Sequence, residues 1–157
     1  MIKLFAMDVD GTLTDGGVYL DGNGGEMKRF DIQDGLGLVV LMRMGVKVAF
    51  ISGRFSPATE RRAKELNITA CVNGVKDKLP ALQNMAHEMG ISSAEVAYAG
   101  DDMPDVECIK WAGLGLATNN ARQNVKAAAD WCAPSSGGHG AIRDCAEYII
   151  EYNGEKQ

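Results

Sequence analysis

Four groups of polar residues, far apart along the chain, have the types needed for a reactive centre. They are Asp8-Val9-Asp10, Ser52-Gly53-Arg54, Lys78, and Asp101-Asp102 with Asp105. Carboxylates crowded at one point need a positive charge nearby to remain ionised. Their oxygen atoms suit a hard cation such as Mg²⁺ better than zinc. The sequence therefore predicts a Mg²⁺ site with Asp8, Asp10 and Asp101 as ligands.

These groups could also carry out phosphoryl transfer. A carboxylate such as Asp8 is already anionic and can attack phosphorus without a separate base. Asp10, two residues further on, can protonate the leaving oxygen and later take a proton from water. Lys78 and the Ser52 hydroxyl can hold and neutralise the phosphoryl oxygens. We therefore assign Asp8, Asp10, Ser52 and Lys78 as candidate catalytic residues.

The elements that position these groups alternate between apolar strands and amphipathic helices. Strands are predicted over 2–7, 46–51 and 96–99, with shorter ones over 70–72 and 113–117. Predicted helices run over 56–66 and 76–89, and others begin near residues 34, 104, 121 and 140. This alternation predicts an α/β fold with a doubly wound, mostly parallel, Rossmann-like sheet. Each polar group then follows a strand and faces one crevice at the carboxyl edge.

Two glycine-rich segments interrupt this pattern. Residues 17–30 predict a β-hairpin directly after the first strand, with a turn at Asp21-Gly22-Asn23-Gly24-Gly25. Residues 135–140 predict a flexible segment that could reach a site. The connections between the polar groups are too short to hold a cap domain. We expect a single domain over residues 1–157.

Composition excludes several classes of protein. Sixteen basic against 21 acidic residues give a net charge of −5, which argues against a nucleic-acid-binding protein. No apolar run is long enough to cross a membrane, and no signal-peptide pattern is visible. The four cysteines are scattered and predict reduced thiols. We therefore expect a cytoplasmic protein.

The order of these motifs resembles that of the haloacid dehalogenase superfamily of phosphatases. The resemblance rests on Asp8-Val9-Asp10-Gly11-Thr12-Leu13-Thr14-Asp15, Ser52, Lys78 and Gly100-Asp101-Asp102-Met103-Pro104-Asp105. It implies an aspartyl phosphate on Asp8, a backbone carbonyl of Asp10 on Mg²⁺, and Asp101 as the remaining metal ligand. Asp102 and Asp105 would orient the ligands and waters of the metal.

A closer resemblance is to the group of 3-deoxy-D-manno-octulosonate 8-phosphate (KDO 8-phosphate) phosphatases. It rests on Asp15-Gly16, Tyr19, Gly22, Lys28, Phe30, Asp34-Gly35, Gly37, Arg62, Asp77-Lys78 and the run 137–143. The group is capless and homotetrameric, and a neighbouring subunit helps to close each site. Candidate substrate-binding residues are Gly53, Arg54, Arg62, Gly138, His139 and Arg143. The group commonly has Arg where His139 stands, and a mostly neutral histidine cannot grip a carboxylate in the same bidentate way.

The resemblance implies a Mg²⁺-dependent phosphatase acting on KDO 8-phosphate, a small phosphorylated sugar acid, in lipopolysaccharide synthesis. Two other substrate classes stay open at this point: a nine-carbon keto-sugar-acid 9-phosphate and a broader range of sugar phosphates or nucleotides. A hypothesis of another class is a non-catalytic tetramerisation module. The intact set of Asp8, Asp10, Ser52, Lys78 and Asp101 argues against it, because a scaffold does not need crowded carboxylates.

Overall fold

The computed structural model describes residues 1–156, and a six-stranded parallel sheet lies at its centre. The strand order is β5-β4-β1-β6-β7-β8. The strands are β1 (Leu4–Met7), β4 (Lys47–Ser52), β5 (Ala70–Asn73), β6 (Val96–Gly100), β7 (Leu114–Ala117) and β8 (Trp131–Cys132). The predicted α/β fold is confirmed, and β8 is an edge strand that the sequence pattern did not predict.

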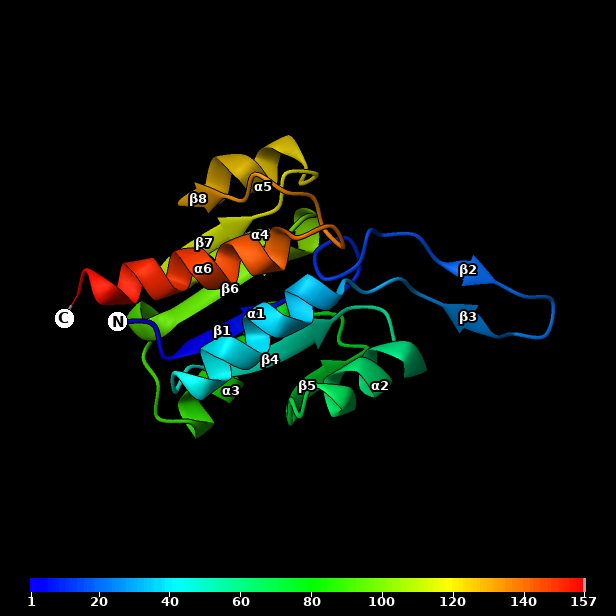
Figure 1. Ribbon diagram of the computed structural model, residues 1–157, viewed down its shortest axis with the longest axis horizontal. Coiled ribbons are helices and arrows are strands. Elements are labelled where there is room, and N and C mark those ends of the chain that lie inside the picture. Colours follow the sequence, from blue (N-terminus) through cyan, green and yellow to red (C-terminus); the bar gives the residue numbers. More distant parts are fainter. Residues whose placement is uncertain (157) are drawn as a thin grey trace.

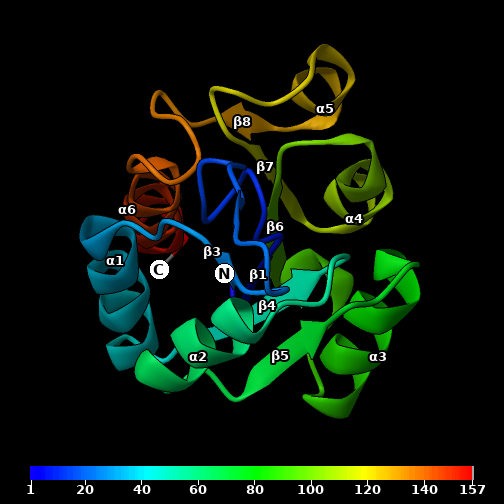
Figure 2. The same cartoon turned by 90° about the vertical axis from the view of Figure 1, so that its right-hand side faces the viewer.

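Helices cover both faces of this sheet (Figure 2). The helices α1 (Ile32–Arg43), α2 (Pro57–Glu65) and α6 (Ala141–Gly154) lie on one face. On the other face lie α3 (Lys78–Glu88), α4 (Val106–Trp111) and α5 (Gln123–Ala128). Alternate residues of β1 enter the two cores, with Phe5 and Met7 on one side and Leu4 and Ala6 on the other. The sheet is therefore buried on both faces, as its apolar strands require.

Side-chain caps fix where the helices next to the carboxyl edge begin. The Ser56 hydroxyl accepts from the backbone N–H of Ala58, and Pro57 occupies the first helical turn of α2. Asp31 caps α1 by accepting from the N–H of Gln33, so α1 begins at Ile32, before the predicted start at residue 34. A cap of this kind contributes about 1 kcal/mol. A single 3₁₀ turn, η2 (Met103–Asp105), leads from β6 into α4, and another, η1 (Ser93–Glu95), precedes β6.

The strand order creates one crevice at the carboxyl edge of the sheet. β1 pairs with β4 on one side and with β6 on the other. The connections that leave these strands diverge at this point, which is where open α/β sheets bind ligands. The amino terminus and the end of α6 lie at the opposite end of the molecule (Figure 1).

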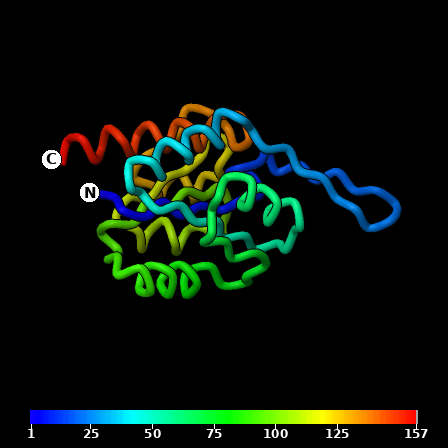
Figure 3. The backbone as a smooth tube through the Cα atoms, turned by 60° about the horizontal axis from the view of Figure 1, so that its bottom comes forward, coloured from blue at the N-terminus to red at the C-terminus, as the bar shows by residue number. Residues whose placement is uncertain are grey.

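A two-stranded arm projects from the carboxyl edge (Figures 1 and 3). It consists of the antiparallel strands β2 (Tyr19–Leu20) and β3 (Glu26–Met27), which confirms the predicted hairpin. The side chain of Asp21 shapes its turn by accepting from the N–H groups of Asn23 and Gly25. Tyr19, Leu20 and Met27 are 61–71% exposed. An isolated two-stranded hairpin is marginally stable in water, so this arm needs contacts beyond its own strands.

No helix in residues 1–156 is both long enough and apolar enough to cross a membrane.

One buried carboxylate joins α1 to α6. The Oδ1 atom of Asp34 accepts from the backbone N–H of Arg143 at 2.9 Å. Its Oδ2 atom is buried and has no hydrogen-bond partner among the described residues. Burial raises the pKa of Asp34 from its ordinary value of 3.8 to about 6. The folded protein therefore holds the Asp34 proton more tightly than the unfolded chain does.

Substituting Asp34→Asn removes this titration. Ionisation of the Asp34 carboxyl group disfavours the folded state. The free energy of unfolding of the wild type therefore falls as the pH rises from about 4 through about 6. We expect the Tm of D34N minus that of the wild type to increase by several degrees over this range. Circular-dichroism melts at each pH measure this difference. Glu88→Gln, at the exposed end of α3, is the control. A D34N difference that is the same at every pH would contradict the assignment.

Candidate active site

A cavity of about 340 Å³ opens at the carboxyl edge of the sheet, between the loops that follow β1, β4 and β6. Most of the residues that the sequence singled out line it. They are Asp8, Asp10, Gly53, Arg54, Lys78, Asp101, Asp102 and Asp105, together with Val75, Lys76 and Pro104. The fold therefore brings motifs that are far apart along the chain together at one site.

A buried ammonium stands at the floor of this cavity. Lys78, the first residue of α3, places its Nζ 2.6 Å from Oδ1 of Asp8 and 2.9 Å from Oδ1 of Asp105. All three side chains are less than 10% exposed. Burial alone would lower the pKa of Lys78, but the two carboxylates raise it above its ordinary value. Lys78 therefore carries a positive charge fixed beside the carboxylate of Asp8.

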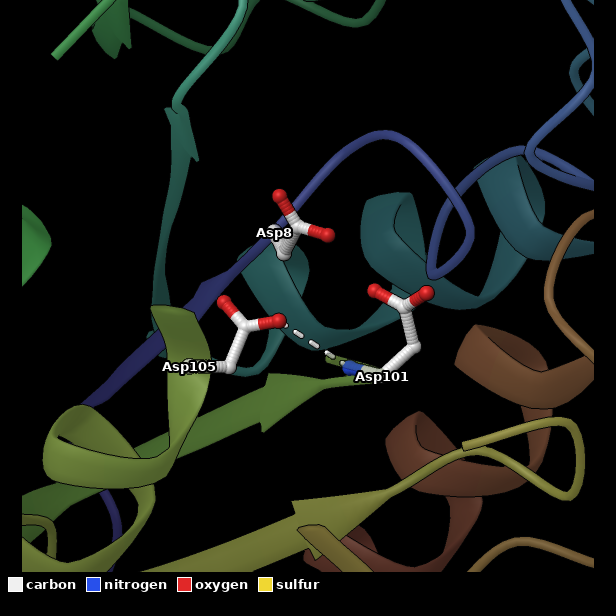
Figure 4. A group of neighbouring side chains, drawn as sticks. All are labelled: Asp8, Asp101 and Asp105. Atoms are coloured by element: carbon white, nitrogen blue, oxygen red, sulfur yellow. Dashed lines mark hydrogen bonds between the residues drawn. The ribbon is translucent and has the colours of Figure 1, made fainter. Parts of the chain in front are cut away.

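Asp105 organises the loop after β6 and uses all of its hydrogen-bonding capacity for this. Its Oδ1 accepts from Lys78 and from the hydroxyl of buried Tyr98 at 2.8 Å. Its Oδ2 accepts from the backbone N–H groups of Asp101 and Asp102. Figure 4 shows the bond to Asp101 beside the carboxylate of Asp8. Asp105 thus fixes the backbone of the Asp101 loop.

The carboxylates at this end of the cavity form a cluster that fits a divalent cation. One oxygen atom from each of Asp8, Asp101 and Asp105 lies within 4.8 Å of the others. The Thr12 hydroxyl lies 3.3 Å from Oδ2 of Asp8 and 3.1 Å from Oδ1 of Asp101, which keeps these two side chains together. Burial raises the pKa of both Asp8 and Asp101, because each charge lacks solvent and stands near other carboxylates. This oxygen-rich, electron-rich set is suited to Mg²⁺.

The turn after Asp10 depends on a glycine. Gly11 has φ of +85°, and a Cβ atom at this position would lie 2.1 Å from Oδ2 of Asp101. The Thr14 hydroxyl accepts from the backbone N–H groups of Gly11 and Gly16, which closes the turn. Glycine therefore allows the β1 loop to approach the Asp101 carboxylate.

Ser52 lies at the end of β4 but does not line the cavity. It is fully buried, and its hydroxyl donates to the carbonyl oxygen of Arg54 at 2.8 Å. In this arrangement Ser52 shapes the loop that carries Gly53 and Arg54. A Cβ atom on Gly53 would lie 3.6 Å from Cε of Lys78, so Gly53 borders the side chain of this lysine.

The arm pairs two further charged side chains with residues that line the cavity, and the site assignment from sequence included neither. The Nζ of Lys28 lies 2.7 Å from Oδ1 of Asp10, and Oε2 of Glu26 lies 2.6 Å from a terminal nitrogen of Arg54. The only signal for Lys28 in the sequence is its place in the family resemblance. The direction of the arm, which determines these pairs, is a property of the folded chain.

Two of the predicted substrate-binding arginines lie outside this cavity. Arg62 donates to the carbonyl of Asp31, pairs with Glu65 at 2.8 Å, and stacks over the ring of Phe30. Arg143 pairs with Glu147 on α6 at 2.6 Å. Both arginines border the start of α1, beside the base of the arm.

The segment 135–140 packs on the β1 loop. A Cβ atom on Gly137 would lie 2.0 Å from the carbonyl oxygen of Gly11, and one on Gly138 would lie 2.4 Å from the nitrogen of Asp15. Asn120 joins the two segments, because its side chain donates to the Gly11 carbonyl and accepts from the Gly137 N–H. The predicted flexible segment is therefore a packed one.

His139 lies within this segment and is exposed. Its Nδ1 lies 3.5 Å from a terminal nitrogen of Arg29, and the same guanidinium donates to the carbonyl of Gly138. Gly138 and His139 thus border the base of the arm and do not line the cavity around Lys78.

Gly137→Ala tests this backbone contact. The added methyl group would collide with the Gly11 carbonyl and displace the loop that carries Asp10, so we expect a lower Tm and at least a tenfold loss of activity. Gly22→Ala, in the arm turn with no atom within 4 Å of the added Cβ, is the matched control. Melting curves and an activity assay measure the two effects. Equal behaviour of the two variants would contradict the role of the contact.

Comparison with known proteins identifies relatives along almost the whole chain. The sequence model of the haloacid dehalogenase-like hydrolases matches residues 71–143. The 3-deoxy-D-manno-octulosonate 8-phosphate phosphatase KdsC of Haemophilus influenzae is 36% identical over 98% of this chain and 86% of its own length. KdsC of Escherichia coli K12 is 34% identical over 98% of this chain and 82% of its own.

Solved structures agree with these relatives. The 3-deoxy-D-manno-octulosonate 8-phosphate phosphatase of Moraxella catarrhalis, solved with magnesium, phosphate and KDO, is 43% identical and has a TM-score of 0.93. The alignment covers 96% of this chain and 86% of that one. The chain shares more than 30% identity with these relatives over most of their length, and it shares their fold. It therefore belongs to the 3-deoxy-D-manno-octulosonate 8-phosphate phosphatase family of haloacid dehalogenase-like hydrolases.

Proposed function

We propose that the protein is a Mg²⁺-dependent phosphatase that hydrolyses 3-deoxy-D-manno-octulosonate 8-phosphate to KDO and phosphate. The observation that carries this proposal is the placement of the Lys78 ammonium 2.6 Å from the carboxylate of Asp8, with Asp101 beside them in the same cavity. The Moraxella relative, 43% identical, holds magnesium, phosphate and KDO together.

The residues of the cavity divide the reaction into two displacements. A carboxylate oxygen of Asp8 attacks phosphorus, the bond from phosphorus to the sugar oxygen breaks, and Asp10 donates a proton to that oxygen. Water then attacks the phosphorus of the aspartyl phosphate and gives a proton to Asp10. Phosphate leaves, and the Asp8 carboxylate is restored. Lys78 stays protonated and stabilises the charge on the phosphoryl oxygens in both steps.

Asp8, Asp101 and the backbone carbonyl of Asp10 would hold the Mg²⁺ ion. When bound, Mg²⁺ supplies positive charge that keeps the Asp8 carboxylate ionised and polarises the phosphoryl group. Asp102 and Asp105 would orient the ligands and waters of this ion. Asp105 already accepts a hydrogen bond from the backbone N–H of Asp101.

The other three hypotheses have weaker support. Relatives with 33–36% identity are named for the eight-carbon substrate, and no feature of the cavity favours a nine-carbon sugar acid or a broader range of phosphates. A tetramerisation module would gain nothing from a lysine buried between two carboxylates, because removing these charges from water costs free energy.

We also propose that the protein forms a homotetramer in which each arm contacts a neighbouring subunit. Tyr19, Leu20 and Met27 expose apolar surface on the arm, and Ile32, at the start of α1, is 85% exposed. Apolar patches of this kind favour association. Three side chains lie near the same start of α1: Arg62, His139 and Arg143. In the tetramer they would bind the carboxylate of a substrate held in the cavity of a neighbouring subunit, and not in the cavity of their own chain.

We place this enzyme in the cytoplasm, in the synthesis of lipopolysaccharide sugars. The four cysteines are free, and Cys108 and Cys145 are buried among apolar residues, as expected for a protein kept in a reducing compartment.

Substituting Asp8→Asn tests the nucleophile. An amide at this position cannot form the aspartyl phosphate, so we expect phosphate release from KDO 8-phosphate to fall at least about a thousandfold. Release is measured with 3-deoxy-D-manno-octulosonate 8-phosphate, a nine-carbon keto-acid phosphate and glucose 6-phosphate, each with Mg²⁺ and with EDTA. The wild type should prefer the eight-carbon substrate and lose activity in EDTA.

Lys47→Met, at the amino end of β4 and away from the cavity, is the control for Asp8→Asn. Unchanged release by D8N would remove Asp8 as the nucleophile. Preference of the wild type for another phosphate would keep the mechanism and reject the substrate. No release from any of the three would reject the phosphatase itself.

Leu20→Asp tests the proposed assembly. A charge on the exposed arm should oppose its contact with a neighbour, so the mass measured by light scattering should fall below that of a tetramer and the KM for KDO 8-phosphate should rise. Met44→Asp is the matched control, because Met44 is 59% exposed and lies at the other end of α1. An L20D protein with the wild-type mass would contradict the role of the arm.

A further inference from the structure

The ammonium of Lys28 is buried although its residue belongs to the exposed arm. Its side chain is fully buried and its Nζ lies 2.7 Å from Oδ1 of Asp10. The angle of approach is not that of a regular hydrogen bond, and neither atom has another partner in residues 1–156. Burying an ammonium with one imperfect partner disfavours folding. A lysine this close to the exposed arm could otherwise extend into solvent, so its position points to a role at the site.

The alternation of side chains along the arm explains how Lys28 reaches the cavity. Glu26 and Lys28 are two residues apart and share one side of the arm, where they contact Arg54 and Asp10. Met27, between them, faces the other way and is 68% exposed. The inward side of the arm therefore contacts Arg54 and Asp10, two residues that line the cavity containing Asp8 and Lys78.

The Lys28–Asp10 pair also lies apart from the charges that surround Asp8. The Lys78 ammonium contacts Asp8 and Asp105, whereas the Asp10 side chain is 27% exposed and is turned toward the arm. Asp10 therefore depends on Lys28, and not on Lys78, for the direction of its carboxyl group. A general acid is effective only when it is within hydrogen-bond reach of the leaving oxygen.

We propose that Lys28 is a positioning residue that holds the Asp10 carboxyl group toward the leaving oxygen of the substrate. This proposal rests on the phosphatase function proposed above. In this role Lys28 makes the arm part of the active site of its own chain. Its contact with Asp10 affects the first displacement, in which the sugar oxygen leaves. A leaving group that needs no proton should not depend on Lys28.

Lys28→Met, which keeps the length and apolar character of the stem, tests the proposal with two substrates. KDO 8-phosphate has an alkoxide leaving group that needs a proton, whereas p-nitrophenyl phosphate releases a stable phenolate. The ratio kcat/KM reports the steps up to the aspartyl phosphate, so the later role of Asp10 toward water does not enter. We expect K28M to lose at least tenfold in kcat/KM for KDO 8-phosphate and less than threefold for p-nitrophenyl phosphate. Lys28→Arg should recover part of the loss.

Binding measurements separate positioning from direct recognition of the sugar. The affinity for KDO 8-phosphate is compared by calorimetry in the D8N variant and in the D8N/K28M double variant, neither of which can form the aspartyl phosphate. Affinities within threefold of each other support the positioning role. A tenfold weaker affinity in the double variant would make Lys28 a substrate-binding residue and overturn the proposal.

The remaining outcomes are also decisive. Lys47→Met, which removes an exposed lysine far from the cavity, should match the wild type with both substrates. Equal losses of K28M with both substrates, or no loss with KDO 8-phosphate, would overturn the role of Lys28 and leave the phosphatase function intact. A wild-type protein inactive on both substrates would overturn the proposed function, and the role of Lys28 with it.

Discussion

The buried ammonium of Lys78 is the contact on which the site depends. It joins the end of β1, through Asp8, to the loop after β6, through Asp105, and it comes from the first turn of α3. Asp8 and Asp105 contact this positive charge, and Asp101 lies beside them. These three carboxylates outnumber the one ammonium by two charges, which one divalent cation would balance. A site for Mg²⁺ therefore fits the charges that the fold brings together, as well as the chemistry of phosphate.

The glycines around the site act through close packing. Gly11 brings the β1 loop against Asp101, and Gly137 brings the later segment against Gly11 in turn. Asn120 connects the two backbones with both ends of its amide. The position of Asp10 is thus fixed by a stack of backbone segments that side chains would force apart. A glycine-rich run beside a reactive loop can mean contact as easily as mobility.

The sequence predicted the parts of the site that depend on local pattern. Asp8, Lys78 and Asp101 follow or begin elements with strong apolar periodicity, so their common edge could be derived from the alternation of strands and helices. The strand β8 was missed because Trp131-Cys132 is too short to show a period. The ion pair between Lys28 and Asp10 was missed because it depends on the direction in which the arm leaves the body. Arg62 and Arg143 lie outside the cavity because they contact the backbone carbonyls of Asp31 and Gln33 at the start of α1, so their predicted contact with substrate stays a prediction.

The two sides of one strand of the arm can serve two purposes in a capless enzyme: contact with its own active site and contact with a neighbouring subunit. A phosphatase without a cap domain needs another source of cover for its reacting atoms. Along the arm, Glu26 and Lys28 face the cavity and Met27 faces away, because side chains alternate in an extended segment. The charged side can serve the chemistry of its own chain while the apolar side remains free for a neighbour. Assembly through the outer side of the arm would then hold its inner side against Arg54 and Asp10. Contact between subunits and the placement of the general acid would therefore depend on the same short strand.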